Sequence, residues 1–278
     1  MRKKKWTKAT FTAILLTTGL IAAFCFRKEK TAVIDTTFKD DDCLVLPANG
    51  MNFVFDTGAD ITLLYTDTIP HSALFFYHAA VTDIYGNEIK QKKYLLPYPG
   101  LLNDGRWLQA VLILPKSSGM KEVDGVWGTD IINHSNWNID FKRKTIDNQS
   151  GRPDRTADMI LAYREKESRW VIDLQLDSIV VKDVIIDTGY TRSDLILPKG
   201  YEDRLDIEPF RKDICYNFQN TPFEIDLYVR RECLINHASV KETVISFSEG
   251  EHVIGLPFFK RFSSVYIDTH EKMIFCYD

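Results

Sequence analysis

The sequence has few of the residues and motifs that mark metal-binding, nucleotide-binding or unstructured chains. Its five cysteines include no Cys-x-x-Cys pair, and its six histidines show no ligand spacing such as His-Glu-x-x-His. Gly125 and Gly128 are too close together for a phosphate-binding loop, and no Lys-Ser or Lys-Thr follows them. With only 14 glycines and 10 prolines but 17 Phe and 12 Tyr, the chain is neither low-complexity nor disordered. We therefore expect a globular protein that uses no metal and no cofactor.

Beyond the N-terminus, acidic residues outnumber basic ones. Residues 1–30 contain eight Lys or Arg and one acidic residue, for a net charge of +7. Because the whole chain of 278 residues has a net charge of −4, the remaining 248 residues carry −11. A body this acidic binds phosphate backbones poorly, so we expect no nucleic-acid partner.

The N-terminal segment 1–30 is predicted to be a targeting signal or a membrane anchor. Ala9–Phe26 contains no charged residue, and its 18 residues are at the lower limit for spanning a bilayer. Because basic residues precede it, the positive-inside rule keeps the N-terminus in the cytoplasm and exports the rest. We expect an uncleaved membrane anchor; the alternatives are a cleaved signal peptide, which would make the protein secreted, and a buried helix of a soluble protein. The first two place residues 31–278 outside the cytoplasm, in the periplasm or the extracellular space.

An exported body permits disulfides but does not require them. Four cysteines lie beyond Cys25, and they allow the pairs Cys215–Cys233 and Cys43–Cys276. Buried free thiols explain these cysteines equally well.

The body of the sequence contains a repeat. Residues 52–59 (NFVFDTGA) resemble residues 184–190 (VIIDTGY), and the two aspartates are 131 positions apart. Residues 125–128 (GVWG) likewise resemble residues 252–255 (HVIG), 127 positions later. Two motifs that recur in one order at nearly one offset indicate an internal duplication.

Each half is predicted to consist mainly of strands. Trp170–Leu176 and Ile179–Ile186 are β-branched runs separated by a short turn, which is typical of a hairpin. Asn-Gly at 49–50 predicts a matching hairpin before the first Asp-Thr-Gly. The helix candidates, Thr129–Asn133 and Leu256–Phe262, are short.

A polar linker with several helix and strand breakers, residues 147–158, separates the two halves. We therefore predict an all-β chain in three parts. These parts are the N-terminal segment 1–30, a first lobe 31–150 and a second lobe 151–278.

The two Asp-Thr-Gly turns are the candidate catalytic elements. A single copy is most often an ordinary turn. Here, however, each copy ends an apolar strand, which buries a carboxylate, and burial is costly unless the carboxylate is paired or used. If the two halves face each other, Asp56 and Asp187 cannot both ionise easily, so one pKa rises and the pair shares a proton. Such a pair can deprotonate a water for attack on an amide while it protonates the carbonyl oxygen, without a metal.

At these residues the chain resembles the retropepsin and pepsin superfamily of aspartic peptidases, over roughly residues 40–147 and 165–277. The resemblance implies two retropepsin-like β-barrel lobes related by a pseudo-twofold axis, with short helices and a cleft between the lobes. It also implies that Asp56 and Asp187 are the catalytic pair. Because both lobes lie in one chain, it implies a monomer, where viral members need a homodimer.

The resemblance also assigns supporting roles to the other residues of each turn. Thr57 and Thr188 would brace the two loops against each other, and Gly58 and Gly189 would let the backbone approach the carboxylates. The second copy departs from the family pattern, because bulky Tyr190 follows the glycine where members often carry Ser or Ala. No small hydroxyl follows either glycine, so we expect a pH optimum nearer neutral than that of pepsin.

A flap over the cleft is predicted at Asp83–Glu88. Tyr85 and Gly86 would lie near the tip of a hairpin there, and an ordinary surface turn is the alternative.

The sequence thus predicts an exported, membrane-anchored aspartic endopeptidase. Its partner would be a peptide or protein substrate held extended between the lobes. By resemblance, apolar side chains would flank the bond that is cut. Two other functions stay open: a peptide-binding module of the same fold in which Tyr190 spoils the pair, and a structural envelope protein that only uses the stable fold.

Overall fold

The computed structural model describes residues 34–38, 43–48, 50–82, 88–97, 108–116, 122–216 and 222–278. Within these ranges the protein is all-β, as predicted. Its helical elements there are single turns, namely α2 (Thr129–Ile132), α3 (Leu256–Phe259) and the 3-10 turn η2 (Glu202–Arg204). No helix in the described ranges is long and apolar enough to cross a membrane. The predicted anchor Ala9–Phe26 and the predicted flap residues Tyr85 and Gly86 lie outside the described residues.

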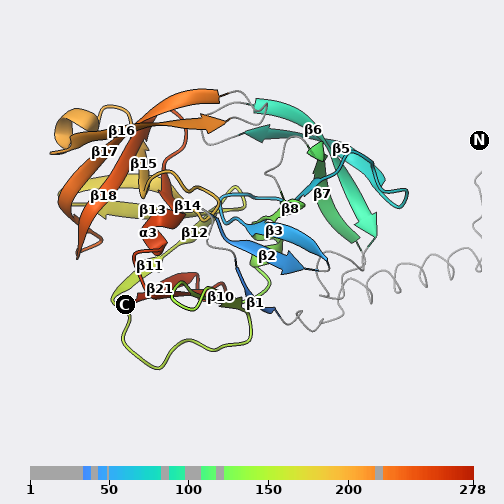
Figure 1. Ribbon diagram of the computed structural model, residues 1–278, viewed down its shortest axis with the longest axis horizontal. Helices are drawn as coiled ribbons and strands as arrows, with labels where there is room; N and C mark the ends of the chain where they lie inside the picture. Colours follow the sequence, from blue (N-terminus) through green and yellow to red (C-terminus); the bar gives the residue numbers. More distant parts are fainter. Residues whose placement is uncertain are drawn as a thin grey trace, which may run out of the picture.

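The first half of the chain forms a sheet that, in its described part, has seven strands, drawn in blue to green in Figure 1. Their spatial order is β2 (Val45–Ala48), β3 (Met51–Phe55), β8 (Gly125–Trp127), β4 (Leu63–Tyr65), β7 (Leu108–Leu114), β6 (Glu88–Pro97) and β5 (Leu74–Thr82). The hairpin predicted before the first Asp-Thr-Gly is therefore β2–β3, and β5 is the edge strand.

The second half forms a sheet with eight described strands, drawn in yellow to orange-red in Figure 1. Their spatial order is β12 (Arg164–Lys166), β13 (Arg169–Leu176), β14 (Ile179–Asp187), β19 (Val253–Gly255), β15 (Leu195–Pro198), β18 (Ala238–Ser248), β17 (Pro222–Ile235) and β16 (Glu208–Tyr216). The predicted hairpin before the second Asp-Thr-Gly is β13–β14, and β16 is the edge strand.

The two sheets pair their strands in the same way. In each, the strand that leads to Asp-Thr-Gly runs parallel to the strand of the hydrophobic-hydrophobic-Gly motif, as β3–β8 and as β14–β19. The next neighbour is antiparallel, β4 or β15, and it is followed by a parallel partner, β7 or β18. The sequence repeat thus coincides with a repeat of strand order and direction.

The strands that lead to the two Asp-Thr-Gly turns are central in their sheets. The last apolar residues before the two aspartates are all buried, namely Phe53, Val54 and Phe55 in β3 and Val184, Ile185 and Ile186 in β14. Because successive side chains of a strand point to opposite faces, a continuous apolar run fits a strand that is covered on both faces. The sequence therefore places each aspartate at the end of a buried strand.

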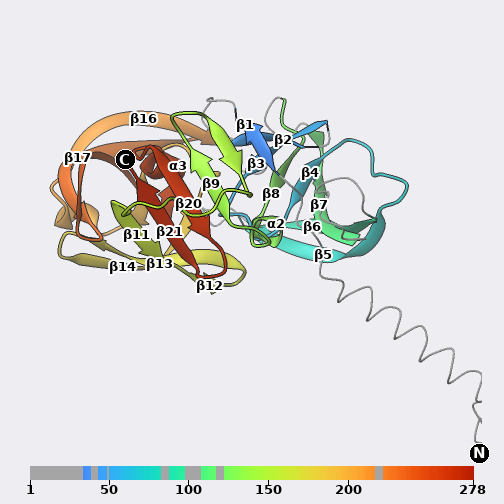
Figure 2. The ribbon, with the colours of Figure 1, turned by 90° about the horizontal axis from the view of Figure 1, so that it is seen from below.

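A third sheet, with six described strands, joins the two halves. Figure 2 shows the molecule from the side on which this sheet lies. Its spatial order is β1 (Asp35–Thr37), β10 (Thr145–Asp147), β9 (Trp137–Asp140), β20 (Ser264–Asp268), β21 (Met273–Tyr277) and β11 (Met159–Ala162). The hairpins β9–β10 and β20–β21 close the two halves and pair with each other through β9 and β20. This pairing could not be predicted, because nothing in either strand's pattern identifies its neighbour.

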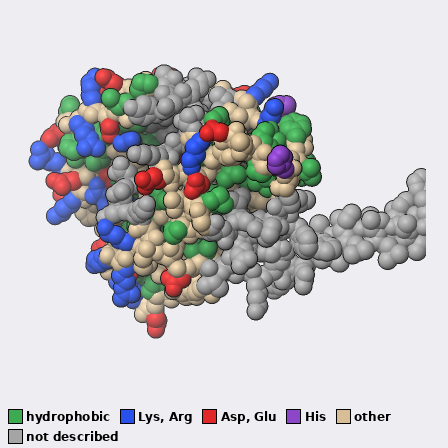
Figure 3. Space-filling model, turned by 45° about the vertical axis from the view of Figure 1, so that its right-hand side comes forward, with side chains coloured by type: hydrophobic (Ala, Val, Ile, Leu, Met, Phe, Trp, Pro, Cys, Tyr) green, Lys and Arg blue, Asp and Glu red, His purple; other side chains and the backbone are tan. Residues whose placement is uncertain are grey.

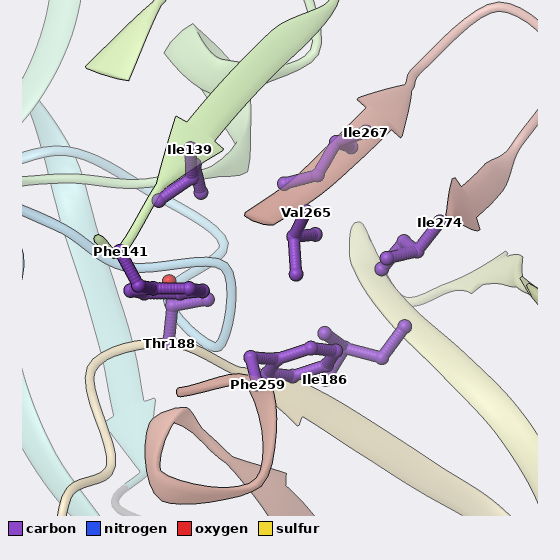
Figure 4. Close-up of a pocket in the computed structure, with 8 residues that line it drawn as sticks. All are labelled: Ile139, Phe141, Ile186, Thr188, Phe259, Val265, Ile267 and Ile274. Carbon is purple, nitrogen blue, oxygen red and sulfur yellow. The ribbon is translucent and has the colours of Figure 1, made fainter. Parts of the chain in front are cut away.

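The core is continuous across the two halves, since one apolar cluster contains residues of both sheets and of the joining sheet. A small cavity remains in it beneath the second Asp-Thr-Gly turn (Figure 4). Its lining is apolar apart from one threonine and comes from β9, β14, the residues that directly follow these two strands, β20, β21 and α3, namely Ile139, Phe141, Ile186, Thr188, Phe259, Val265, Ile267 and Ile274. An apolar void of this kind stays dry and belongs to the core.

The two disulfides that the sequence allowed do not form. Cys233 and Cys276 are both buried thiols. The Cys233 sulfur lies 3.2 Å from the Thr243 hydroxyl. Burial raises the pKa of the Cys276 thiol, so this group stays protonated and unreactive.

A buried ion pair ties α3 to the loop that follows the second Asp-Thr-Gly. The Asp194 side chain is only 2% exposed, and it accepts hydrogen bonds from Arg261 Nε at 2.8 Å and from a terminal guanidinium nitrogen at 2.6 Å. The backbone N–H of Val244 also donates to Asp194. In the first half, the carboxylate of Asp130 on α2 makes a comparable tie, because it accepts hydrogen bonds from neighbouring side chains.

Replacing Arg261 by Leu should destabilise the fold strongly. The change leaves Asp194 buried without its cation, and breaking a buried pair from one side typically costs about 3–5 kcal/mol. Denaturant unfolding followed by tryptophan fluorescence measures the loss. The control is Arg143→Leu, because Arg143 is 83% exposed and 3.8 Å from Asp140, and an exposed pair contributes about 0–1 kcal/mol. Equal effects of the two substitutions would show that Asp194 does not depend on Arg261.

Candidate active site

The two Asp-Thr-Gly turns hold their aspartates in the same way. In the first turn, the N–H groups of Gly58 and Ala59 donate to Asp56 Oδ1 at 2.8 and 3.1 Å. In the second, the N–H groups of Gly189 and Tyr190 donate to Asp187 Oδ1 at 2.8 and 2.9 Å. Each turn thus fixes one carboxyl oxygen through its own backbone, which leaves the other oxygen for contacts outside the turn.

The threonines brace the two turns against each other. The Thr57 hydroxyl donates to the Ile186 carbonyl at 2.7 Å and accepts from the Thr188 N–H at 3.1 Å. Reciprocally, the Thr188 hydroxyl donates to the Phe55 carbonyl at 2.8 Å and accepts from the Thr57 N–H at 3.1 Å. Both threonines are buried, so water does not substitute for these bonds. Each turn therefore depends on the other for its hydrogen bonds.

The glycines place each turn directly against the opposite carboxyl group. A Cβ atom added to Gly58 would lie 2.4 Å from the Asp187 carboxyl carbon, and one added to Gly189 would lie 2.4 Å from that of Asp56. Real Cβ contacts are essentially never this short. Only glycine therefore fits at both positions, because the opposite carboxyl group lies too close to each backbone for a side chain. The sequence already suggested this role for both glycines.

The structure brings Asp56 and Asp187 together, and their carboxyl groups are hydrogen-bonded to each other. Asp187 is 6% exposed, and Asp56 is partly buried. Burial raises the pKa of Asp56. Burial, together with the neighbouring charge of Asp56, raises the pKa of Asp187 well above its ordinary value. The pair therefore holds one proton, shared between the two carboxyl groups, over a wide pH range.

The phenol of Tyr190 does not cover the carboxyl pair. Its hydroxyl lies 3.0 Å from the Ser193 hydroxyl and 3.3 Å from the Ser246 hydroxyl. Its ring packs in an apolar cluster of the second sheet with Val171, Ile185, Ile196 and Val253. Burial raises the pKa of Tyr190 to about 12, so the phenol stays neutral. Towards the site, Tyr190 contributes its backbone N–H.

Tyr65 is a site residue that the sequence analysis missed. It lies at the end of β4, partly buried. Burial and the charge of Asp56 raise its pKa to about 12, so Tyr65 remains a neutral hydrogen-bond donor near the pair. No motif contains this residue, and its position becomes apparent only from the pairing of β4 with β8, which has no signature in the sequence.

The site is made of carboxyl, hydroxyl and backbone groups, and within the described residues no cluster of three or more His, Cys, Asp or Glu is suited to a metal ion. Compared with known proteins, the chain matches no family model and no curated sequence.

Asp187→Asn should stabilise the protein at neutral pH and lose this advantage in acid. The folded pKa of Asp187 is raised above the ordinary 3.8, so the wild type loses stability as the pH rises from about the unfolded pKa towards the folded pKa. Asparagine keeps the Oδ1 acceptor but does not ionise. Thermal melts of both proteins from pH 3 to pH 8 measure the difference.

Asp124→Asn is the control of opposite sign. The hydrogen bond from Lys116 lowers the pKa of Asp124, so this carboxylate stabilises the fold above the unfolded pKa and loses that effect as the pH falls. Its replacement should lower the melting temperature at pH 7 and change little in acid. If Asp187→Asn behaves like Asp124→Asn, the raised pKa of Asp187 is wrong.

Proposed function

We propose that the protein is an aspartic endopeptidase in which Asp56 and Asp187 activate a water molecule to hydrolyse peptide bonds. The observation that carries the proposal is the hydrogen bond between two carboxyl groups, each presented by one of two cross-braced Asp-Thr-Gly turns. The repeated strand order of the two sheets supports the finer architecture, two retropepsin-like lobes related by a pseudo-twofold axis.

The proposed chemistry follows from two carboxyl groups that share one proton. The ionised carboxylate takes a proton from water as the water oxygen bonds to the substrate carbonyl carbon, and the protonated partner gives its proton to the carbonyl oxygen. The resulting gem-diol collapses as the C–N bond breaks. The leaving nitrogen receives a proton from the carboxyl that took one from water, and the other carboxylate takes back the proton of a gem-diol hydroxyl, which restores the pair with one shared proton.

Two observations favour catalysis over the binding module and the envelope scaffold. First, the Tyr190 ring is packed against the second sheet and bonded to two serines, so it leaves the carboxyl pair unobstructed. Second, the close contacts of Gly58 and Gly189 keep two carboxyl groups together in a buried place, which costs stability. A protein that only bound peptides or only supported the envelope would gain nothing from this loss of stability.

The substrate in this proposal is an extended polypeptide. A chain that lies between the lobes would use backbone hydrogen bonds for affinity and side-chain pockets for selectivity. Neutral Tyr65, near Asp56, is the candidate donor to the substrate backbone. We further propose that the protein acts as a monomer outside the cytoplasm, held to the membrane by Ala9–Phe26.

Wild-type full chain in mild detergent should cut members of a mixed peptide library, and Asp56→Asn or Asp187→Asn should abolish the cuts. General acid and base groups contribute about 10²–10⁴-fold each, so the loss should reach at least that size. Mass spectrometry of the library from pH 3 to pH 8 gives cleavage sites and the pH profile together. Because the pKa of Asp187 is raised, activity should persist above the pH at which an ordinary aspartic acid loses its proton.

Asp226→Asn is the matched control, since Asp226 is 61% exposed on β17. It should cut like the wild type. If cuts persist in either active-site variant, or if the wild type leaves the library intact while peptides bind, the endopeptidase proposal is wrong and the binding module replaces it.

A further inference from the structure

The two large sheets end in edge strands of different chemistry. On β5, four consecutive large apolar residues are exposed: Leu74 (61%), Phe75 (53%), Phe76 (54%) and Tyr77 (43%). We call these four residues the β5 stripe. On the other sheet's edge strand, β16, two exposed apolar residues are separated by the charged run 211–213. A row of exposed apolar side chains on an edge strand is an aggregation hazard unless something covers it.

The β5 stripe is exposed on both faces of its strand. The adjacent residues Leu74 and Phe75 point to opposite faces, and a register shift against β6 follows between Phe75 and Tyr77; all four side chains are exposed. The rings contact one another and their neighbours, with Phe76 and Tyr77 4.9 Å apart and Phe75 5.2 Å from His78. Figure 3 shows hydrophobic side chains gathered around histidines at this end of the molecule. The stripe is therefore a protruding apolar edge, which suits insertion into a soft apolar medium better than packing on a flat protein face.

Basic residues line the neighbouring strand. Lys90, Lys92 and Lys93 lie on β6, and they pair across the hairpin with Ala80, His78 and Tyr77. Lys93 Nζ lies 3.1 Å from the Tyr77 hydroxyl and 5.3 Å from the centre of its ring. One acidic residue, Glu88, is on β6 at its far end, opposite Thr82. In a body whose charge is −11, this local excess of lysine points to a partner with negative charge.

The length of the N-terminal tether limits how far the body can be from a membrane. Only residues 27–33 separate the apolar segment Ala9–Phe26 from Ile34. Even fully extended, these seven residues reach about 25 Å. Ile34 is fixed to the body, because its N–H donates to Asn148 Oδ1 at 2.8 Å. The following strand β1 contacts β2, which is the edge of the first sheet opposite to β5 (Figure 1). The tether therefore keeps the body close to the bilayer, and the β5 edge lies across the width of the first sheet from the attachment point.

We propose that the β5–β6 hairpin docks on the surface of an anionic lipid bilayer. The β5 stripe enters the headgroup region, where Tyr and Phe are favoured, and Lys90, Lys92 and Lys93 contact lipid phosphates. The inference rests on the proposed membrane attachment, because the short tether gives a weak surface contact a high effective concentration. Docking would hold the proposed peptidase in one orientation and direct it to polypeptides close to the bilayer.

The test places the full chain in lipid nanodiscs that contain a photoactivatable phospholipid, with phosphatidylglycerol or with phosphatidylcholine alone. After illumination, mass spectrometry locates the lipid adducts. In the anionic discs, adducts on residues 74–77 should exceed those on residues 210–214 of β16 by about tenfold, because one edge is apolar and the other carries charges. In the neutral discs, the excess should fall.

Three pairs of substitutions serve as variants. Phe75→Ser with Phe76→Ser should reduce labelling of β5 about tenfold, whereas Phe210→Ser with Ile214→Ser, the matched pair on β16, should leave it unchanged. Lys90→Gln with Lys92→Gln should remove the preference for anionic discs. Because all these side chains are exposed, thermal melts should show folded proteins.

Different results would contradict the docking, the membrane anchor and the peptidase proposal. Equal labelling of β5 and β16, no labelling of residues 74–77, or crosslinks from β5 to a second protein chain would overturn the docking proposal. Exclusion of the full chain from nanodiscs would overturn both the anchor and the docking. Asp56→Asn should abolish cleavage without changing lipid labelling, so a failure of the peptidase proposal is recognised independently.

Discussion

The exchange of hydrogen bonds between Thr57 and Thr188 is the constraint on which the candidate site depends. Each hydroxyl donates to a carbonyl and accepts an N–H from the opposite half, so neither turn satisfies its buried polar groups alone. The joining sheet supports this arrangement from below, because β9 and β20 pair across the halves. The two halves are therefore held in one relative position at the place where the aspartates meet.

The electrostatics of the pair follow from this close contact. The glycines bring the turns so near that a Cβ atom at either would collide with the opposite carboxyl group. Burial and mutual repulsion then make two negative charges unfavourable, and the backbone N–H groups orient one oxygen of each carboxyl. The site is thus a proton-sharing pair whose geometry is set by backbone N–H groups and by two buried threonine hydroxyls.

The sequence analysis predicted the all-β class, both hairpins before the turns and the short helices, because these depend on local patterns such as apolar runs and Asn-Gly. It also singled out Asp56 and Asp187 as the pair, since a repeat read at one offset implies equivalent positions. The joining sheet, the Arg261–Asp194 ion pair and Tyr65 could not be predicted, because they depend on contacts between distant residues that leave no local signal. The side-chain direction of Tyr190 likewise depends on Ser193 and Ser246, which meet it only in the folded chain.

The most direct test of the account is a titration of the aspartate carboxyl carbons by NMR, with Asp56→Asn and Asp187→Asn used to assign the two signals. The account predicts that both carbons report the same two steps, because the carboxyls share a proton, and that the later step lies well above the ordinary range for an aspartate. If each carbon instead titrates in a single independent step near pH 3.9, the carboxyls do not act as a pair and the central claim fails.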